Sequence, residues 1–312
     1  MKKYRTLFFG TPEFVIPVLD FLYQNEELIG VVTQPDKPKG RGLSLSPSPV
    51  KVWALGRRLK VFEPQKLKDS LFLSTLKELS PDLIVVFAYG KILPKEVLDI
   101  PKEGCWNIHL SLLPKYRGAS PVQWALLEGE KETGVTIMLM DEGMDTGPIL
   151  LQKRLLIEEE DNAQTLLQKL SELSVPALKE ALDLWKEGKL KPEPQSNEGV
   201  SYAPLIKKED GFFTFEEPAE LIVRKLKAFY PWPGIFTKYK GKLLKLYSAK
   251  VVSFEGEAKP GEVLKIDKEG ILVATSRNAL LLKEVQLEGK KRVSGFEFAL
   301  GQRLKPGDLL TS

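Results

Sequence analysis

Asn107 and His109, separated by one residue, have side chains and a spacing that suit chemistry. His109 is the only histidine in the 312 residues. The pair lies in a run, CWNIHL, that predicts a strand, and strand side chains alternate between faces, so both would project to the same side. An amide and an imidazole aimed at one point can donate hydrogen bonds to an oxygen that becomes negative during a reaction.

A third polar side chain, Asp145, follows the next predicted strand, Gly134 to Met140, in a glycine-rich loop. We expect two successive strand ends to bring it to one crevice with Asn107 and His109. A carboxylate there can hold the histidine proton or accept a proton from an amine. The trio points to acyl transfer without a covalent enzyme intermediate, and a serine hydrolase fits less well because no G-x-S-x-G occurs. Taken singly, such a histidine is more often a core residue and such an aspartate more often makes an Asx turn, and it is their combination that favours a site.

The elements expected to position these side chains alternate between strands and helices in the first half of the chain. Apolar, β-rich runs at 4–9, 28–33 and 82–90 are separated by helical stretches. The last run is almost continuously apolar, which is typical of a strand covered on both faces. The pattern predicts an α/β fold with an open, mostly parallel, Rossmann-like sheet. A single Gly10 in place of G-x-G-x-x-G argues against dinucleotide binding.

The second half changes character after an amphipathic helix at about 163–187. A stretch rich in Pro, Gly and polar residues follows, and then short, closely spaced strands that predict a smaller OB-like β-barrel domain. We therefore expect a catalytic domain at 1–189, a linker at 190–207 and an OB-like domain at 208–312 that binds nucleic acid.

The net charge of +4 hides two strongly basic runs. Residues 37–62 and residues 221–254 contain lysines and arginines and no acidic residue. Such a distribution suits a polyanion such as nucleic acid, although two solvated faces are the plainer alternative for either run alone. The residues expected to contact nucleic acid are Lys37, Lys39, Arg41, Lys238, Lys240, Lys242 and Lys245.

The composition also argues against several classes of protein. A single cysteine, Cys105, and a single histidine rule out a disulfide framework and the usual zinc sites, so no metal is expected. The first residues lack the apolar core of a signal peptide, and no stretch approaches transmembrane length. We expect a cytoplasmic monomer with no membrane partner.

Longer motifs resemble a known family. GTPEF, TQPDKPKGRG, PSPVKVWA, VVFAYGKILPKEVL, NIHLSLLPKYRGASP and KAFYPWPG resemble the methionyl-tRNA formyltransferases, within the wider folate-dependent formyltransferases. The resemblance implies the formyltransferase fold and a formyl transfer from 10-formyltetrahydrofolate to the α-amino group of methionyl initiator tRNA, for translation initiation. It also implies that Asn107, His109 and Asp145 are the catalytic trio.

The same resemblance implies binding residues. Folate would contact Ser111, Leu112, Leu113 and Pro114, and the pterin pocket would include Phe87, Ala88, Tyr89 and Gly90. Arg41 matches a basic residue of the insertion loop that touches the acceptor end of the tRNA. The chain departs from the family pattern at Leu110, where Gly is frequent, at Leu43 and Ser44, where two lysines are frequent, and at Thr214, where an acidic residue is frequent.

Two other functions stay open at this point. The Asn-x-His motif and the later Asp are shared across the folate-dependent formyltransferases, so they specify the reaction more than the acceptor. The acceptor could therefore be a small amine, such as an amino sugar or a ribonucleotide. A non-catalytic RNA-binding protein with a vestigial pocket is the third possibility.

Overall fold

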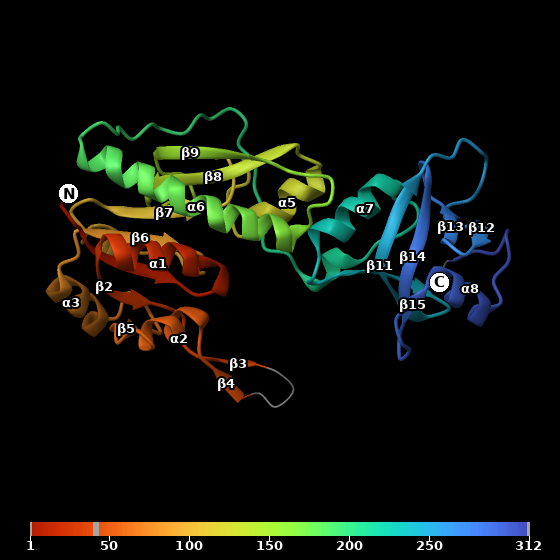
Figure 1. Ribbon diagram of the computed structural model, residues 1–312, viewed down its shortest axis with the longest axis horizontal. Coiled ribbons are helices and arrows are strands. Elements are labelled where there is room, and N and C mark those ends of the chain that lie inside the picture. Colours follow the sequence, from red (N-terminus) through yellow and green to blue (C-terminus); the bar gives the residue numbers. More distant parts are fainter. Residues whose placement is uncertain (1, 40–43, 311–312) are drawn as a thin grey trace. The chain divides into compact units, whose positions relative to one another are not determined.

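A seven-stranded sheet forms the centre of the first part of the chain in the computed structural model, which describes residues 2–39 and 44–310 (Figure 1). In space the order is β5-β2-β1-β6-β7-β8-β9. The bounds are β1 (Arg5–Gly10), β2 (Glu27–Val32), β5 (Val61–Phe62), β6 (Leu83–Phe87), β7 (Cys105–His109), β8 (Glu132–Leu139) and β9 (Ile149–Leu156). Neighbours from β5 to β7 pair in parallel, whereas β7–β8 and β8–β9 are antiparallel. The predicted open, mostly parallel, Rossmann-like sheet is confirmed.

Helices connect these strands and begin where the sequence provides caps. Ser48 caps α2 by accepting a hydrogen bond from the Lys51 N–H, and Asp69 caps α3 in the same way. The helical elements are η1 (Glu13–Val15), α1 (Ile16–Asn25), α2 (Pro49–Leu55), α3 (Ser70–Leu79), α4 (Lys95–Leu98), α5 (Pro121–Glu128) and α6 (Ala163–Lys186). Two short strands, β3 (Lys37–Lys39) and β4 (Ser44–Ser46), pair in the insertion after β2.

The two faces of β7 have different surroundings. Trp106 points to one face, where Trp185 of α6 packs edge-on against its ring at 5.5 Å. Cys105 points to the other face and joins an apolar cluster that includes Phe9, Val86 and Tyr89. Because strand side chains alternate, Asn107 and His109 lie on the same face as Cys105.

An antiparallel sheet dominates the last third of the chain, in the order β10-β11-β14-β13-β12, with β15 paired to β14. Tyr239 and Phe298 are in edge contact in its core. The elements are η2 (Lys208–Gly211), α7 (Ala219–Ala228), β10 (Ile235–Tyr239), β11 (Lys242–Val252), β12 (Val263–Asp267), β13 (Gly270–Ala274), β14 (Ala279–Leu287), β15 (Val293–Ser294) and α8 (Gly295–Gln302). The predicted second, smaller β domain is confirmed, and its closure into an OB-like barrel stays a prediction.

Contacts divide the chain into two compact units. The first contains residues 1–121, 131–157 and 166–204, and the second contains 122–130, 158–165 and 205–312. The domain boundaries at 189 and 207 stay a prediction. Residues 193–203, which we call the strap, belong to the first unit and bond to it through the backbone, for example from Ala203 N–H to the Arg117 carbonyl at 2.7 Å. In the described ranges, no helix is long and apolar enough to cross a membrane.

Candidate active site

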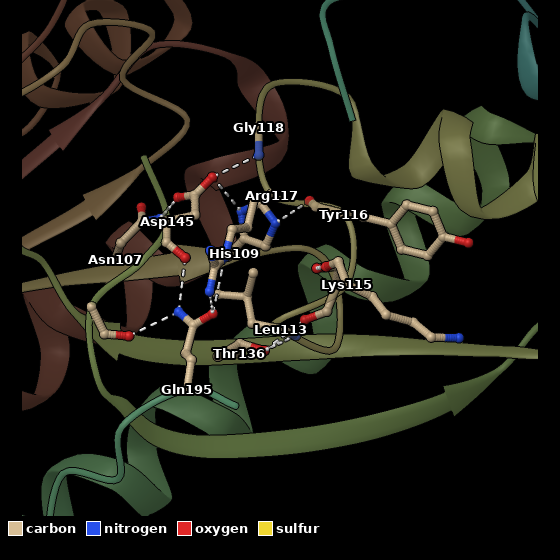
Figure 2. A network of polar contacts seen from close by, with 12 residues as sticks. Asn107, His109, Leu113, Lys115, Tyr116, Arg117, Gly118, Thr136, Asp145 and Gln195 are labelled. Carbon is tan, nitrogen blue, oxygen red and sulfur yellow. Dashed lines mark hydrogen bonds and ion pairs between the residues drawn. The ribbon is translucent and has the colours of Figure 1, made fainter. Parts of the chain in front are cut away.

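The carboxylate of Asp145 lies between the two polar side chains of β7 (Figure 2). Asn107 donates from Nδ2 to Asp145 Oδ1 at 3.3 Å, and Nδ1 of His109 lies 3.6 Å from Asp145 Oδ2. The structure thus brings the three residues together. The one-residue spacing on β7 accounts for the shared face of Asn107 and His109, as the alternation of strand side chains requires.

The route that brings Asp145 to this site differs from the expected one. Because β8 runs antiparallel to β7, His109 lies opposite Thr136, and the end of β8 lies beside Trp106. The C-terminal ends of the two strands therefore lie at opposite ends of the strand pair, and the expectation that they converge is wrong. The loop between β8 and β9 returns along the sheet instead, and it is this loop that brings Asp145 back to the β7 side chains.

The loop depends on two unusual backbone positions. Asp145 has a φ of 55°, in the left-handed region, which costs a non-glycine residue about 1–3 kcal/mol. Aspartate tolerates this region better than most residues because its short side chain bonds locally. At Gly147 an added Cβ would lie 1.8 Å from the Leu139 carbonyl oxygen, so only glycine fits there.

The second oxygen of Asp145 is also bonded to the turn that follows β7. The Gly118 N–H donates to Asp145 Oδ2 at 2.8 Å. Gly118 has a φ of 121°, and an added Cβ would lie 2.7 Å from the Ala203 carbonyl oxygen. The carboxylate therefore accepts from a side-chain amide and a backbone amide and faces an imidazole, an arrangement that fixes its direction.

His109 is held from both sides. Nε2 lies 2.8 Å from the carbonyl oxygen of Tyr116, and because a carbonyl only accepts, the proton of the neutral ring is assigned to Nε2. Nδ1 then faces Asp145 and carries a proton only when the ring is charged. The side chains of His109 and Asp145 are 6% and 16% exposed, so this charge pair would be largely shielded from water.

The segment from Ser111 to Pro114 forms a tight, internally bonded turn. Ser111 is buried and donates from Oγ to the Lys115 carbonyl at 2.6 Å. Thr136 accepts from the Leu113 N–H at 3.2 Å and donates to the Ser111 carbonyl at 2.6 Å. Of the four predicted folate contacts, Ser111 and Leu113 are buried, whereas Leu112 and Pro114 are partly exposed. Leu110 is buried as well, so this departure from the family pattern affects packing.

The predicted pterin segment, Phe87 to Gly90, comprises the last residue of β6 and the turn after it. β6 and β7 are parallel with Val86 opposite Asn107. The chain turns directly after β6 at Ala88, which has a φ of 50°, and the Tyr89 carbonyl accepts from Gln34 Nε2 at 2.8 Å. The rings of Phe87 and Tyr89 point into the core and are in edge contact with Phe14 and Phe9, at 5.4 Å and 5.2 Å. Burial raises the pKa of Tyr89 to about 12. What this segment can offer a ligand is therefore its backbone, Ala88 and Gly90.

Three residues of the site were not identified from the sequence. Gln195 of the strap bonds to Asp145 and to Arg117 (Figure 2). Ser201, also of the strap, bonds to Tyr116. Their partners are tens of residues away, and the strap has the composition of a linker. No spacing pattern in the sequence indicates these contacts.

The predicted nucleic-acid contacts lie apart from the trio in sequence and element. Lys238, Lys240, Lys242 and Lys245 are exposed on β10, β11 and the turn between them. Lys37 on β3 is exposed and donates to Gln34. Arg41 and Leu43 lie outside the described residues, as do the side chains of Lys39 and Ser44, while Thr214 is exposed.

Comparisons with known proteins cover nearly the whole chain. Residues 2–182 match the family model described as Formyl transferase, and residues 205–303 match the model described as Formyl transferase, C-terminal domain. The chain is 48% identical over 308 residues to the methionyl-tRNA formyltransferase of Caldanaerobacter subterraneus subsp. tengcongensis, covering 98% of this chain and 99% of that protein. It is 47% identical over 311 residues to the methionyl-tRNA formyltransferase of Geobacter sulfurreducens, covering 99% and 98%.

A solved structure shares the fold. It is that of WlaRD, a sugar 3N-formyl transferase, in the presence of dTDP and 5-N-formyl-THF, with a TM-score of 0.65, 19% identity, and coverage of 93% of this chain and 100% of that one. At this identity the likeness shows the architecture alone, whereas the two sequence relatives match from end to end. The chain belongs to the methionyl-tRNA formyltransferase family.

Proposed function

We propose that the chain transfers the formyl group of 10-formyltetrahydrofolate to the α-amino group of methionyl initiator tRNA, giving formylmethionyl-tRNA for translation initiation. The observation that carries the proposal is the Asp145 carboxylate between Asn107 and His109. This arrangement places hydrogen-bond donors and a proton acceptor around one point, which is what the addition of an amine to a formyl carbon requires.

Asn107 acts on the oxygen that becomes negative. An amide nitrogen carries two hydrogens, so Asn107 can give one to Asp145 and direct the other at the formyl oxygen. His109, when protonated on Nδ1, is a second donor at the same point. One such preorganised donor is typically worth about 3 to 4 kcal/mol of transition-state stabilisation.

Asp145 acts on the proton. Its carboxylate faces Nδ1 of His109 across a gap of 3.6 Å, and its oxygen can receive the proton that the amine loses as the new bond forms. Positioned proton transfer of this kind contributes roughly 100-fold to 10,000-fold. Because the Gly118 N–H and Asn107 already orient the carboxylate, little reorganisation is needed during the reaction.

The residues near the trio suit a folate co-substrate. When bound, 10-formyltetrahydrofolate supplies an electrophilic formyl carbon. β6 and β7 are neighbouring parallel strands, so Ala88, directly after β6, and His109, the last residue of β7, lie at the same end of the sheet. The chain turns there through left-handed backbone at Ala88 and Gly90, and the rings of Phe87 and Tyr89 pack into the core, which leaves peptide groups and small side chains for a ligand. A flat ring with polar edges would find backbone partners there.

The acceptor is distinguished by its size and charge. The exposed lysines of β10 and β11 can contact tRNA phosphates, whereas a small amine would gain nothing from them. We place the reaction in the cytoplasm, where initiator tRNA is used. We also propose that the protein is a monomer, because Asn107, His109 and Asp145 all come from one unit of one chain.

A formyl-transfer assay tests the proposal. Purified protein is given 10-formyltetrahydrofolate and, in parallel, methionyl initiator tRNA, methionyl elongator tRNA or an amino sugar nucleotide. We expect transfer to the initiator tRNA above both alternatives. Absence of transfer to initiator tRNA, with the folate donor intact, would refute the proposed function.

Charge reversal tests the acceptor class. For Lys238→Glu with Lys245→Glu, we expect the KM for tRNA to rise by about 10-fold or more and to become less dependent on salt, because roughly one phosphate contact is lost per lysine. Lys259→Glu is the matched control, since Lys259 is exposed but lies outside both basic runs. An unchanged KM in the double variant would favour a small amine as the acceptor.

A further inference from the structure

We propose that Gln195, on the strap, is a positioning residue for formyl transfer and acts by holding the backbone on both sides of the Asp145 carboxylate. This inference rests on the function proposed above. Figure 2 shows the Gln195 side chain next to Asp145 and Arg117, with its amide bonded to both segments that surround the trio.

The nitrogen end of Gln195 bonds the aspartate loop. Nε2 donates to the carbonyl of Asp145 at 2.8 Å and to the carbonyl of Gly147 at 2.8 Å. Both amide hydrogens are therefore used on two carbonyls two residues apart. Asp145 has a left-handed φ of 55°, so its carboxylate keeps its direction only while the peptide groups around it stay fixed.

The oxygen end of Gln195 bonds the turn after β7. Oε1 accepts from Arg117 Nε at 3.2 Å and from Arg117 Nη2 at 2.8 Å. A guanidinium only donates, so this contact sets which end of the amide is oxygen and aims Nε2 at the loop. The residues on either side of Arg117 belong to the site, because the Tyr116 carbonyl accepts from His109 and the Gly118 N–H donates to Asp145.

The strap is anchored on both sides of Gln195. Glu193 and Ile149 exchange backbone hydrogen bonds at 2.9 Å and 2.8 Å. Further along, Ser201 accepts from the Tyr116 N–H at 2.9 Å through its hydroxyl. Gln195 is thus held between two fixed points, and its side chain connects the segment at 145–147 with the segment at 116–118.

Two variants separate the donor role of Gln195 from its bulk. Gln195→Glu keeps the shape but places a carboxylate against two carbonyls, while Gln195→Leu removes both donors. For each we expect kcat to fall by roughly 10-fold to 100-fold, the cost of a small misplacement of a catalytic group, with the KM for tRNA and folate near the wild-type values. A role in substrate binding would instead raise KM and leave kcat unchanged.

Asn197→Asp is the matched control, because it makes the same amide-to-acid change at an exposed position two residues along the strap. A second readout is hydrogen exchange of residues 140–148, measured without substrates. We expect faster exchange in both Gln195 variants, wild-type exchange in Asn197→Asp, and a melting temperature near that of the wild type in all three.

The outcomes separate the two proposals. If the wild type transfers formyl and either Gln195 variant retains wild-type kcat, or if exchange of residues 140–148 is unchanged in Gln195→Leu, the inference about Gln195 is overturned while the proposed function stands. If the wild type transfers no formyl, the proposed function fails and the positioning role falls with it. Lower kcat together with faster exchange confined to the Gln195 variants supports the inference.

Discussion

At the scale of single residues, the site depends on one carboxylate whose partners leave it little freedom. Asp145 accepts from Asn107 and from the Gly118 N–H, and it faces the nitrogen of His109 that has no proton in the neutral ring. The Tyr116 carbonyl fixes the other nitrogen. The geometry therefore assigns different tasks to the two β7 side chains, since Asn107 donates in every state and His109 donates toward the site only when it is charged.

Replacing Asp145 by asparagine keeps the size of the side chain and removes its charge. We expect Asp145→Asn to lower kcat by roughly 100-fold to 10,000-fold, because the proton acceptor and the partner of the charged imidazole are both lost. Steady-state kinetics with methionyl initiator tRNA measure the effect. Asp183→Asn on α6 is the control for loss of one carboxylate from the same unit, and an Asp145→Asn enzyme as active as this control would contradict the assigned role.

At the scale of elements, the antiparallel pairing of β8 with β7 determines how the trio assembles. The loop between β8 and β9 has to reverse direction within a few residues to bring Asp145 back to β7. That reversal brings the backbone at Gly147 against the end of β8, where no side chain fits.

Gly147→Ala tests this packing. The new Cβ would lie 1.8 Å from the Leu139 carbonyl oxygen, so the backbone must shift. We expect the variant to lose about 1 to 3 kcal/mol of unfolding free energy, as overpacked sites do, and to lose activity because Asp145 moves with the loop. Urea unfolding and the formyl-transfer assay measure the two effects.

Gly56→Ala is the matched control for this change. Gly56 follows α2 in the same unit, and its added Cβ would lie 3.6 Å from the nearest atoms, which is ordinary contact. We expect that variant to be as stable as the wild type or slightly more stable. Equal stability of the two alanine variants would show that the reversal at Gly147 is not tightly packed.

The same elements show what sequence can and cannot predict here. Alternation along a strand is enough to put Asn107 and His109 on one face, and a continuously apolar run is enough to predict the buried strand β6. The direction of β8 is not encoded in a local pattern, because a buried, mostly apolar run looks the same in parallel and antiparallel pairing. Gln195 was missed for a related reason. It lies in a segment with the composition of a linker, and its four partner atoms belong to residues about 50 or more positions away.

At the scale of the whole molecule, the sequence already separated the chain into an α/β part and a β part, because hydrophobic periods of 3.6 and 2 residues differ over long stretches. The sequence also shows that the positive charge is concentrated in residues 37–62 and 221–254. Closure of a barrel and the pairing of the strap with the first unit depend on contacts between distant segments, which composition does not report. Contacts between residues far apart in the sequence are therefore harder to predict for this chain than the helices and strands themselves, whatever their size.

The stability of the whole fold should fall at high pH, partly through one buried thiol. Burial, with a contribution from the charge of Asp99, raises the pKa of Cys105 from 9.0 to about 12. Below pH 9 the Cys105 thiol keeps its proton in both the folded and the unfolded chain, and its contribution to the free energy of unfolding is fully present. As pH rises toward 12 the unfolded chain loses the proton first, so the free energy of unfolding falls by up to about 1.4 kcal/mol per pH unit from this group.

Cys105→Ala isolates that contribution. The cost of the lost packing is the same at every pH, so we expect the stability difference between wild type and variant to shrink by about 1 kcal/mol between about pH 8.5 and pH 10. Tyr89, whose pKa burial also raises to about 12, is present in both proteins and cancels. Urea unfolding of both proteins across this range measures the difference, and a constant difference would mean that folding does not raise the pKa of the thiol.

The strap makes the protein less modular than its two sheets suggest. Consider a chimaera that joins the α/β part of one relative, cut at residue 189, to the tail of another. It would take the loop that contains Asp145 from the first protein and the Gln195 amide that bonds this loop from the second. Exchanges of the tail alone therefore belong after residue 204, where the first unit ends. A segment with the composition of a linker therefore has to be exchanged together with the unit that contains Asp145.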